Sequence, residues 1–402
     1  MTNFRLSDWE DDTVLNVGLW NPPGFSFESL SQSEHLIGFS SVILISIAEP
    51  VLLDSLANCM LEYTFTGRIR SLGGPIGEDM VQYGVSRFKR QVAETDEPLA
   101  ILALVNFVKE KGLTLQRCFS QSLSTPHAAH RGIVFEAFGA YLLARAFSDP
   151  TPLSKVFEFV EGGNKVIEAL QGELAQLVTL KKVGDKFETT PVQINDNLWS
   201  NHVFGRSPST VPGTLEWLQN PQDSAFCFPA DTVGPDLIFV LRLTSDDTVL
   251  RVCVQFKNTE YLSPQDTEQA IRATDPSFFL SRKAKDGNTP LCSNPPMRDE
   301  MEEAIKNLGN GTKKAGPCGL LQVLISHPSL PNSNKMDEAA KGSHPLATVS
   351  LRHLEPSGSD LGQAIQSLAN LALQTSDRKR KSSDDIEGAR PKRLKRESRG
   401  TT

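Results

Sequence analysis

One stretch constrains the fold of this chain more than any other: GPDLIFVLRLTSDDTVLRVCVQFKN, residues 234–258. It consists of two apolar runs rich in Val, Ile, Leu and Phe that flank a short polar turn. This pattern predicts an antiparallel β-hairpin that is largely buried. An Asp precedes the first run, and Gln-x-Lys ends the second.

The position of the turn between the two runs determines which residues face each other. If the turn is centred on Ser245 and Asp246, antiparallel pairing places Asp236 opposite Gln255. Alternation then puts Gln255 and Lys257 on one face of the strand. A shift of the turn by one residue would place Asp236 opposite Lys257, so we expect the three polar side chains to converge in either register.

A carboxylate, an amide and an ammonium are costly to bury without partners. A phosphate and a hard cation would be suitable partners. Asp236 offers an anionic oxygen to Mg²⁺ and Gln255 a neutral one, while Lys257 can orient a water or offset the charge that develops on a phosphate. The plainer reading is that Asp236 is a turn residue and that Gln-x-Lys is a solvated strand end.

Helical periodicity adds a fourth residue to this group. Residues 131–147 (RGIVFEAFGAYLLARAF) repeat apolar side chains at helical spacing, and Glu136 falls among them. Glu136 is therefore a further candidate ligand, or else an ion-pair partner of Arg131 or Arg145 in the same helix. His127 and His130 lie just before this helix, and a role in helix entry suits them better than a phosphate contact. Lys283 and Lys285 suit a solvated loop better than a phosphate contact.

Together these residues resemble the PD-(D/E)xK nuclease superfamily. PD at 235–236 followed by QFK at 255–257 resembles the variant with Gln in place of the second acid, found in Mrr-like restriction endonucleases. Glu136 matches the acidic residue that members often carry on the first core helix. The arrangement is similar to the nuclease-type domains of fungal and oomycete Crinkler and retrotransposon-hot-spot-like proteins.

The resemblance implies a restriction-endonuclease-like α/β (α+β) core over residues 120–355, a mixed sheet flanked by helices. The implied activity is Mg²⁺-dependent hydrolysis of DNA phosphodiester bonds. Asp236, Gln255 and Glu136 would hold metal and Lys257 would assist catalysis. Because an amide replaces an acid at Gln255, a catalytically silent module that binds DNA or a protein stays open as the alternative.

The rest of the chain is read from periodicity and composition. Residues 1–115 predict a helical N-terminal unit, and FTGRIRSL…DEPLAILALVNFV faintly resembles the end of the NTPase that precedes such nuclease domains. This unit is either a remnant or an interaction module, since no G-x-x-x-x-G-K-[ST] motif occurs in the sequence. Further along, we expect a helix over 164–183, a helix near 264–275, a loop over 284–318 and a buried strand over 319–326.

Charge separates the tail from the body. Residues 376–402 carry ten Lys and Arg against five Asp and Glu, so this tail is +5; with a total of −7, the remaining residues sum to −12. RKRK at 378–381, a ten-residue spacer and KRLKR at 392–396 match a bipartite nuclear import signal on a disordered segment. The predicted signal residues are Arg378, Lys379, Arg380, Lys381, Lys392, Arg393, Lys395 and Arg396, with an importin as partner. Non-specific nucleic-acid binding is the alternative role of this tail.

Several other classes are disfavoured. The six Cys lie far apart without a C-x-x-C pair, which argues against a zinc ribbon or a disulfide framework and favours a reducing compartment. The run LIGFSSVILISIAEPVLL is short and interrupted, so we expect it to be buried and not to cross a membrane. The N-terminus lacks a signal peptide pattern, so an effector acting in another organism's nucleus would need an unconventional route. A short helix packed on the domain is predicted just before the tail, with an export signal as the alternative; its apolar residues are Leu361, Ile365, Leu368, Leu371 and Leu373.

Overall fold

A computed structural model describes residues 114–370 with gaps, together with residues 61, 64–65, 87–89 and 92–94. The gaps are 124–127, 162–164, 185, 193, 195–203, 222–223, 283–290, 308–318, 343, 355–361 and 364. The stretch DEPLAILALVNFV, the apolar run LIGFSSVILISIAEPVLL and the basic tail all lie outside the described residues.

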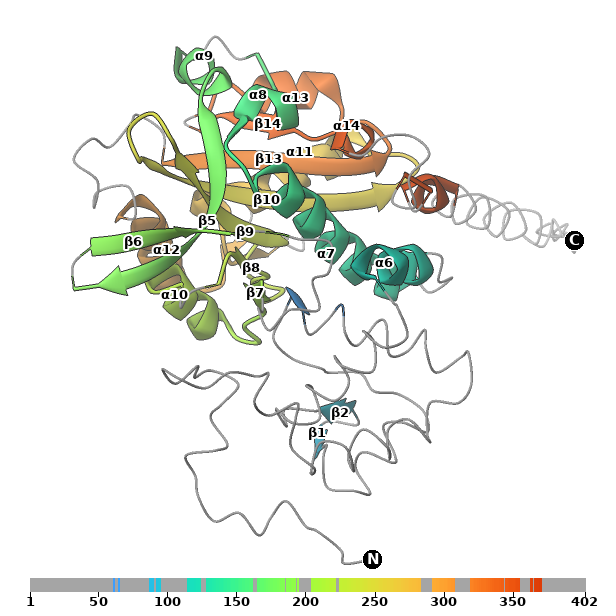
Figure 1. Ribbon diagram of the computed structural model, residues 1–402, viewed down its shortest axis with the longest axis horizontal. Helices are drawn as coiled ribbons and strands as arrows, with labels where there is room; N and C mark the ends of the chain where they lie inside the picture. Colours follow the sequence, from blue (N-terminus) through green and yellow to red (C-terminus); the bar gives the residue numbers. More distant parts are fainter. Residues whose placement is uncertain are drawn as a thin grey trace, which may run out of the picture.

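A curled mixed sheet forms the centre of the described part of the chain (Figure 1). Its strands follow the order β3-β5-β9-β10-β13-β14-β4, with β6 paired to β5, β8 paired to β9, and β7 paired to β8. The strands β5, β9 and β10 pair antiparallel, whereas β10, β13 and β14 run parallel. Their bounds are β3 Thr151–Pro152, β4 Glu158–Phe159, β5 Leu174–Val183, β6 Lys186–Pro191, β7 Gly205–Arg206, β8 Phe226–Cys227, β9 Leu237–Leu243, β10 Val249–Thr259, β13 Leu320–Pro328 and β14 Leu346–Thr348. Two short pairs stand apart, β1 (Arg87–Lys89) with β2 (Val92–Glu94) and β11 (Ser281–Arg282) with β12 (Leu291–Cys292).

Helices cover both faces of this sheet. The bounds are α6 Leu115–Leu123, α7 Ala128–Ala146, α8 Leu153–Val156, α9 Lys165–Gln171, α10 Val211–Gln219, α11 Pro264–Thr274, α12 Pro295–Asn307, α13 Ser333–Ala339 and α14 Leu351–Leu354, with a 3₁₀ turn at Pro276–Phe278. In Figure 1, α7 crosses one face of the central strands, whereas α10 and α12 lie together beyond β9. The mixed α/β fold expected from the sequence is confirmed.

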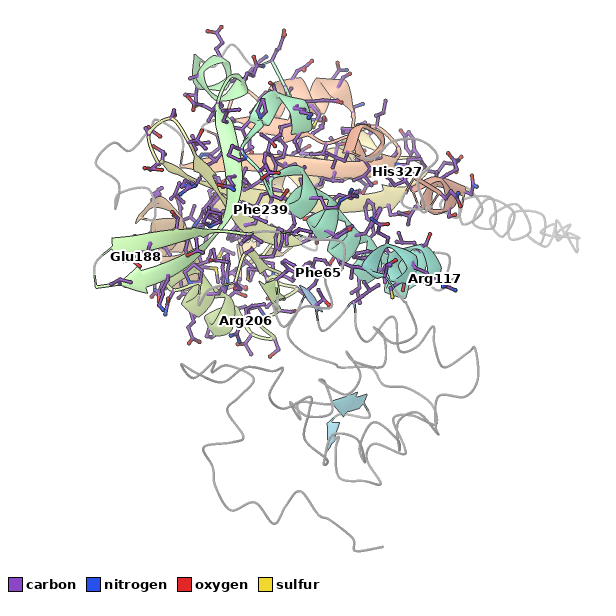
Figure 2. The ribbon with its side chains drawn as sticks, viewed as in Figure 1. Phe65, Arg117, Glu188, Arg206, Phe239 and His327 are labelled. Carbon is purple, nitrogen blue, oxygen red and sulfur yellow. The ribbon has the colours of Figure 1, made fainter. Side chains whose placement is uncertain are left out.

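Alternation along β10 divides the core between the two faces. Leu250, Val252, Val254 and Phe256 join the large apolar cluster that includes α6 and α7. Cys253, on the opposite face, joins the cluster built by α10 and α12. Figure 2 shows Phe239 of β9 near the middle of the molecule, where it contributes to the first of these clusters. β10 is covered on both faces, and its other side chains there are mostly apolar. The polar residues at its end therefore lie where apolar side chains would be expected.

The second face also holds a buried cation. Arg251 is fully buried, and one of its Nη atoms donates to the backbone carbonyl of Leu218 at 2.8 Å, in the last turn of α10. Within the described part of the chain, its Nε and other Nη atoms have no hydrogen-bond partner. Burial lowers the pKa of Arg251 to about 9, and the neighbouring Cys253 and Cys227 oppose that shift. Nothing in the sequence pattern singled out this arginine.

Three predicted elements are confirmed. The helix expected over 131–147 is α7, the helix near 264–275 is α11, and the strand over 319–326 is β13. The start of α11 follows from its sequence, because the hydroxyl of Ser263 accepts the backbone N–H of Asp266 at 3.1 Å and Pro264 occupies the first turn.

Two predicted elements are wrong. The helix expected over 164–183 ends at Gln171, and residues 174–183 form β5, which pairs with β9 on one side and β6 on the other. The apolar residues of LAQLVTLKKV fit the spacing of a helix as well as that of a strand. Pairing in the sheet therefore determines its conformation. The loop expected over 284–318 contains α12, whose Met301 and Ile305 are buried against α10 and the sheet.

The last described helical residues, 365–370, pack onto the domain, as predicted. Ile365 and Leu368 are buried in the core cluster of α7. The backbone carbonyl of Ile365 lies 3.0 Å from the Nε2 atom of the buried His327, near the end of β13. Figure 2 places His327 at the end of the sheet beside these residues. Among the described helices, none has the length and apolar character needed to cross a membrane.

Candidate functional site

The hairpin formed by β9 and β10 has the predicted register. Leu237 pairs with Val254 and Arg242 with Val249, which is the pairing expected from a turn centred on Ser245 and Asp246. In the turn, the side chain of Asp246 accepts the backbone N–H of Thr248 at 2.9 Å. The hairpin therefore delivers Asp236 to the neighbourhood of Gln255, as the sequence indicated.

Asp236 lies at the point where β9 begins and β10 continues beyond it. Gly234, two residues earlier, has a φ of +146°, and a Cβ atom there would lie 2.7 Å from the carbonyl oxygen of Ala273. Only glycine suits such a backbone. The Asp236 N–H donates to the Val254 carbonyl at 2.9 Å, and its Oδ2 atom accepts the Phe256 N–H at 2.7 Å. The carboxylate thus satisfies a backbone donor of β10 that is otherwise left open beyond the end of β9.

Gln255 binds the same oxygen. Its Nε2 atom donates to Oδ2 of Asp236. The side chain is only 5% exposed, and its Oε1 atom has no hydrogen-bond partner in the described part of the chain. A buried carbonyl oxygen without a donor costs free energy. This oxygen is therefore available to a cation or a water.

Glu136 reaches the site from α7 because that helix approaches β10 closely. The rings of Phe135 and Phe256 meet edge to face with centroids 5.5 Å apart. A Cβ atom on Gly139 would overlap the Phe256 ring, so glycine permits this approach. Glu136 lies one turn earlier on the same helix and is half-buried.

Electrostatics connects Glu136 to the other predicted residues. Its pKa is raised from 4.5 to about 8, first by burial and then by the negative charge of Asp236. Lys257 opposes this shift, and Asp231 adds to it. The pKa of Asp236 is also raised, chiefly by burial, although the Phe256 N–H, Lys257 and Gln255 stabilise its anionic form. Asp236 therefore interacts with each of the other three residues predicted from sequence, Glu136, Lys257 and Gln255.

Asp231 is the residue that sequence reasoning missed. It lies on the exposed loop before β9 and raises the pKa of both Glu136 and Asp236. Its position five residues before Asp236, in FPADTVGPD, gave no periodic signal, because loop aspartates are common for conformational reasons. With three carboxyl groups and one ammonium, the cluster is short of positive charge.

Arg131 and Arg145 were the alternative ion-pair partners expected for Glu136. The Arg145 guanidinium lies over the ring of Tyr141, 5.8 Å from its centroid. The side chains of Arg131, His127, His130, Lys283 and Lys285 lie outside the described residues.

The oxygen atoms of Asp236, Glu136 and Gln255 would supply only part of the coordination shell of a metal ion. Among the described residues, no three His, Cys, Asp or Glu side chains converge closely enough to hold a metal ion by themselves. A cation between Asp236 and Glu136 would need the free Oε1 atom of Gln255 and water molecules to complete its shell. That is the pattern of Mg²⁺, which keeps several waters and takes one or two carboxylates.

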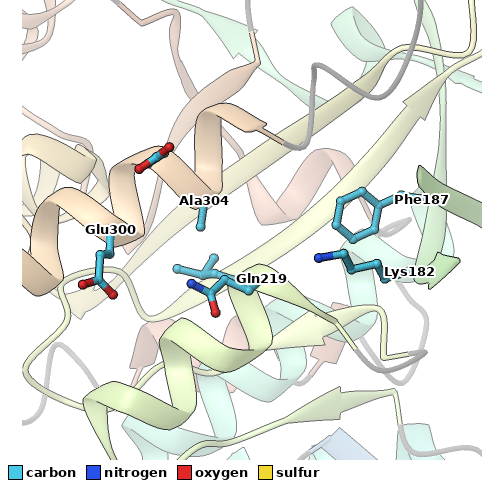
Figure 3. A pocket seen from close by; sticks show the side chains of 7 residues that line it. Lys182, Phe187, Gln219, Glu300 and Ala304 are labelled. Carbon is cyan, nitrogen blue, oxygen red and sulfur yellow. The ribbon is translucent and has the colours of Figure 1, made fainter. Parts of the chain in front are cut away.

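A separate surface cavity of about 380 Å³ lies elsewhere (Figure 3). Side chains from the β5–β6 hairpin, α10 and α12 line it, namely Lys182, Phe187, Leu218, Gln219, Glu300, Glu303 and Ala304. None of the predicted site residues is among them.

Comparisons with protein-family models, with curated protein sequences and with solved structures gave no match. The candidate site therefore has to be judged on its own geometry and charge.

Proposed function

We propose that this protein is a nuclear, Mg²⁺-dependent endonuclease that hydrolyses phosphodiester bonds in DNA. The observation that carries the proposal is the cluster at the end of β10, in which Gln255 donates to Asp236 and the charges of Asp236 and Lys257 act on Glu136. An uncompensated group of acids with one lysine is suited to binding a divalent cation together with a phosphate.

The order of elements supports a restriction-endonuclease-like core for this proposal. Helix α7 precedes three antiparallel strands, β5, β9 and β10, and helices α11 and α12 then precede β13, which runs parallel to β10. This is a mixed sheet between helices, with the acidic residues of the predicted motif on α7 and at the start of β9.

The raised pKa values support the presence of a cation during function. Burial and mutual repulsion favour the protonated forms of Glu136 and Asp236 in the protein alone. A divalent ion held by Asp236, by Glu136 and by the free Oε1 of Gln255 would favour their ionised forms. When bound, Mg²⁺ would supply charge neutralisation on the phosphate and acidify a coordinated water.

Side chains of the protein would carry out the remaining steps of the hydrolysis. Lys257, half-buried on the same strand, is placed to position the attacking water and to offset the negative charge that develops on the phosphate oxygens. In the reaction, the water releases a proton to solvent as its oxygen bonds to phosphorus, the bond from phosphorus to the 3′ oxygen breaks, and the leaving oxygen takes up a proton from solvent. Asp236 is fixed for this role by its bonds to Phe256 and Gln255.

A nicking assay tests the proposal. Wild-type protein should convert supercoiled plasmid to the nicked form with Mg²⁺ and not with EDTA. Asp236→Ala and Lys257→Met should each reduce the rate by at least about 100-fold, because each removes a group that acts on the transition state.

Controls separate catalysis from folding. Since Asp236 also accepts two hydrogen bonds, Asp236→Asn keeps an acceptor oxygen and should retain the wild-type melting temperature while losing activity. Equal nicking by wild type and Asp236→Ala, or no nicking by either, would exclude the enzymatic function.

The second candidate is a silent nuclear module of the same fold that binds DNA or a protein. It is favoured by one observation: Oδ2 of Asp236 is already occupied by donors from Gln255 and Phe256. In that case Asp236 would act as a strand-end cap, and DNA binding without cleavage is the expected result.

A further inference from the structure

The proposed hydrolysis gives no role to Asp231. This residue is exposed on the loop that leads into β9, whereas Asp236 at the start of that strand is half-buried. The negative charge of Asp231 acts on both Glu136 and Asp236. Asp231 therefore belongs to the same cluster of charges, as its solvent-exposed member.

The loop that carries Asp231 is held in place by hydrogen bonds. The Ala230 N–H donates to the hydroxyl of the fully buried Thr214 of α10 at 3.1 Å. The Val233 carbonyl accepts the Leu280 N–H at 2.9 Å, and the Val233 N–H donates to the Ala230 carbonyl at 2.8 Å. Asp231 thus occupies a central position of a tight turn that is fixed at both ends. Because its backbone is already ordered, its carboxylate can bind a ligand at little cost in entropy.

A buried oxygen atom next to these carboxylates indicates what kind of ligand the cluster takes. Nε2 of Gln255 donates to Asp236, and Oε1 belongs to the same amide group. The Gln255 side chain is 5% exposed, and Oε1 has no hydrogen-bond partner among the described residues. A carbonyl oxygen accepts hydrogen bonds and binds cations, but it does not bind anions. This atom therefore calls for a hydrogen-bond donor or a cation.

The charges of the cluster match a divalent cation. In their ionised forms the three carboxyl groups carry three negative charges and Lys257 carries one positive charge, which leaves −2. Without Asp231 the cluster would carry −1, and a divalent ion would leave it positive. Hard divalent cations also take carboxylate and amide oxygens as ligands. The occupant that this cluster fits best is therefore a divalent metal ion.

We propose that Asp231 binds this divalent ion through one of the ion's coordinated water molecules and so raises the affinity of the site for it. The inference rests on the proposed function, because the ion is the one that Asp236, Glu136 and Gln255 would hold. A water molecule is the expected link, since no three acidic side chains of the described residues converge closely enough to bind one ion directly. Mg²⁺ usually keeps several waters when a protein binds it. Asp231 is thus a positioning residue for the ion.

Metal binding is measured by isothermal titration calorimetry of the full-length protein with Mn²⁺, in the absence of DNA. Mn²⁺ is the probe because it takes the same oxygen ligands as Mg²⁺. The buffer contains about 0.3 M KCl, where the screening length is roughly 6 Å, so that distant charges contribute little. The variants are Asp231→Asn, which removes the charge and keeps the shape, and Asp231→Glu, which keeps the charge. Asp149→Asn, at an exposed carboxylate after the end of α7, is the matched control.

Asp231→Asn should weaken Mn²⁺ binding by at least about fivefold, as expected for the loss of a partner beyond the direct ligands. Asp231→Glu should recover most of the affinity, and Asp149→Asn should bind like wild type. In EDTA the melting temperature of Asp231→Asn should equal or exceed that of wild type, because a repulsion with Glu136 and Asp236 is removed. With saturating Mn²⁺ its melting temperature should rise less than that of wild type.

Equal Mn²⁺ affinity of wild type and Asp231→Asn would overturn the role of Asp231, and plasmid nicking by wild type would then still support the proposed function. A lower melting temperature of Asp231→Asn in EDTA would also overturn it, since Asp231 would then stabilise the fold itself. Mn²⁺ binding that depends on Asp231, in a protein that nicks no plasmid, would contradict only the proposed hydrolysis. Wild type that binds no Mn²⁺ would overturn both.

Discussion

The carboxyl group of Glu136 is half-buried near two other carboxyl groups, and this governs how its charge affects stability. Its pKa is about 8 in the folded protein against 4.5 in the unfolded chain. Between these values the folded state holds a proton that the unfolded state has lost. Stability therefore falls as pH rises through this window, by about 1.4 kcal/mol per pH unit from this group.

Replacing Glu136 by Gln should remove that dependence. We expect Glu136→Gln to melt at a temperature close to wild type at pH 5 and clearly higher at pH 8, in EDTA. Thermal unfolding followed by circular dichroism at several pH values measures the difference. Glu168→Gln, at an exposed position on α9, controls for the loss of a surface charge. Parallel pH profiles for wild type and Glu136→Gln would contradict the burial of this carboxyl.

Single residues also show what sequence could reveal about the site. Asp236, Gln255 and Lys257 were predictable because the turn lies midway between two apolar runs and strand alternation has a period of two. Asp231 was not, because its approach depends on a loop with no repeating pattern. The hydrogen bonds to Oδ2 of Asp236 were equally invisible, since they depend on where β9 stops relative to β10.

At the scale of elements, the contact between α7 and β10 positions Glu136. Gly139→Ala would place a methyl group in the Phe256 ring, and overpacking of this kind costs about 1–3 kcal/mol. We expect a lower melting temperature for Gly139→Ala and reduced nicking, because α7 must move away from the strand. Gly132→Ala is the matched control on the same helix, where nothing lies within 4 Å of the added carbon.

The control should stabilise the helix by about 0.5–1 kcal/mol. The double variant Gly139→Ala with Phe256→Leu should recover part of the lost stability, since a smaller side chain accepts the methyl group. Additive effects of these two changes would show that the helix and the strand do not meet at this point.

The spacing of apolar residues predicted some helices and strands correctly and others wrongly. Helix α7 was predictable because its apolar side chains recur over five turns. Strand β5 was mistaken for a helix because its apolar run fits both periods, and its partners β6 and β9 settle the choice. Helix α12 was missed because prolines, glycines and asparagines on either side of it dominate the composition of residues 284–318.

At the scale of the whole molecule, charge is divided between an acidic body and a basic tail. A fusion of the full chain to a tandem fluorescent protein should accumulate in the nucleus. Replacing Lys392, Arg393, Lys395 and Arg396 by Ala should move it to the cytoplasm, because both basic clusters must contact the receptor. Fluorescence microscopy measures the ratio, with Asp384→Ala and Asp385→Ala in the spacer as the control. Nuclear accumulation that survives this replacement would contradict the bipartite import signal.

The strand order determines when the candidate site can form during synthesis. β10 pairs with β13, and the edge of the sheet is completed only when Thr348 of β14 pairs with Glu158 of β4. Pairings between such distant parts of the chain form late, after long loops have closed. A ribosome that has made the hairpin has therefore not yet made a working site. Truncated products that end before about residue 350 should therefore lack the nicking that we expect of the full chain.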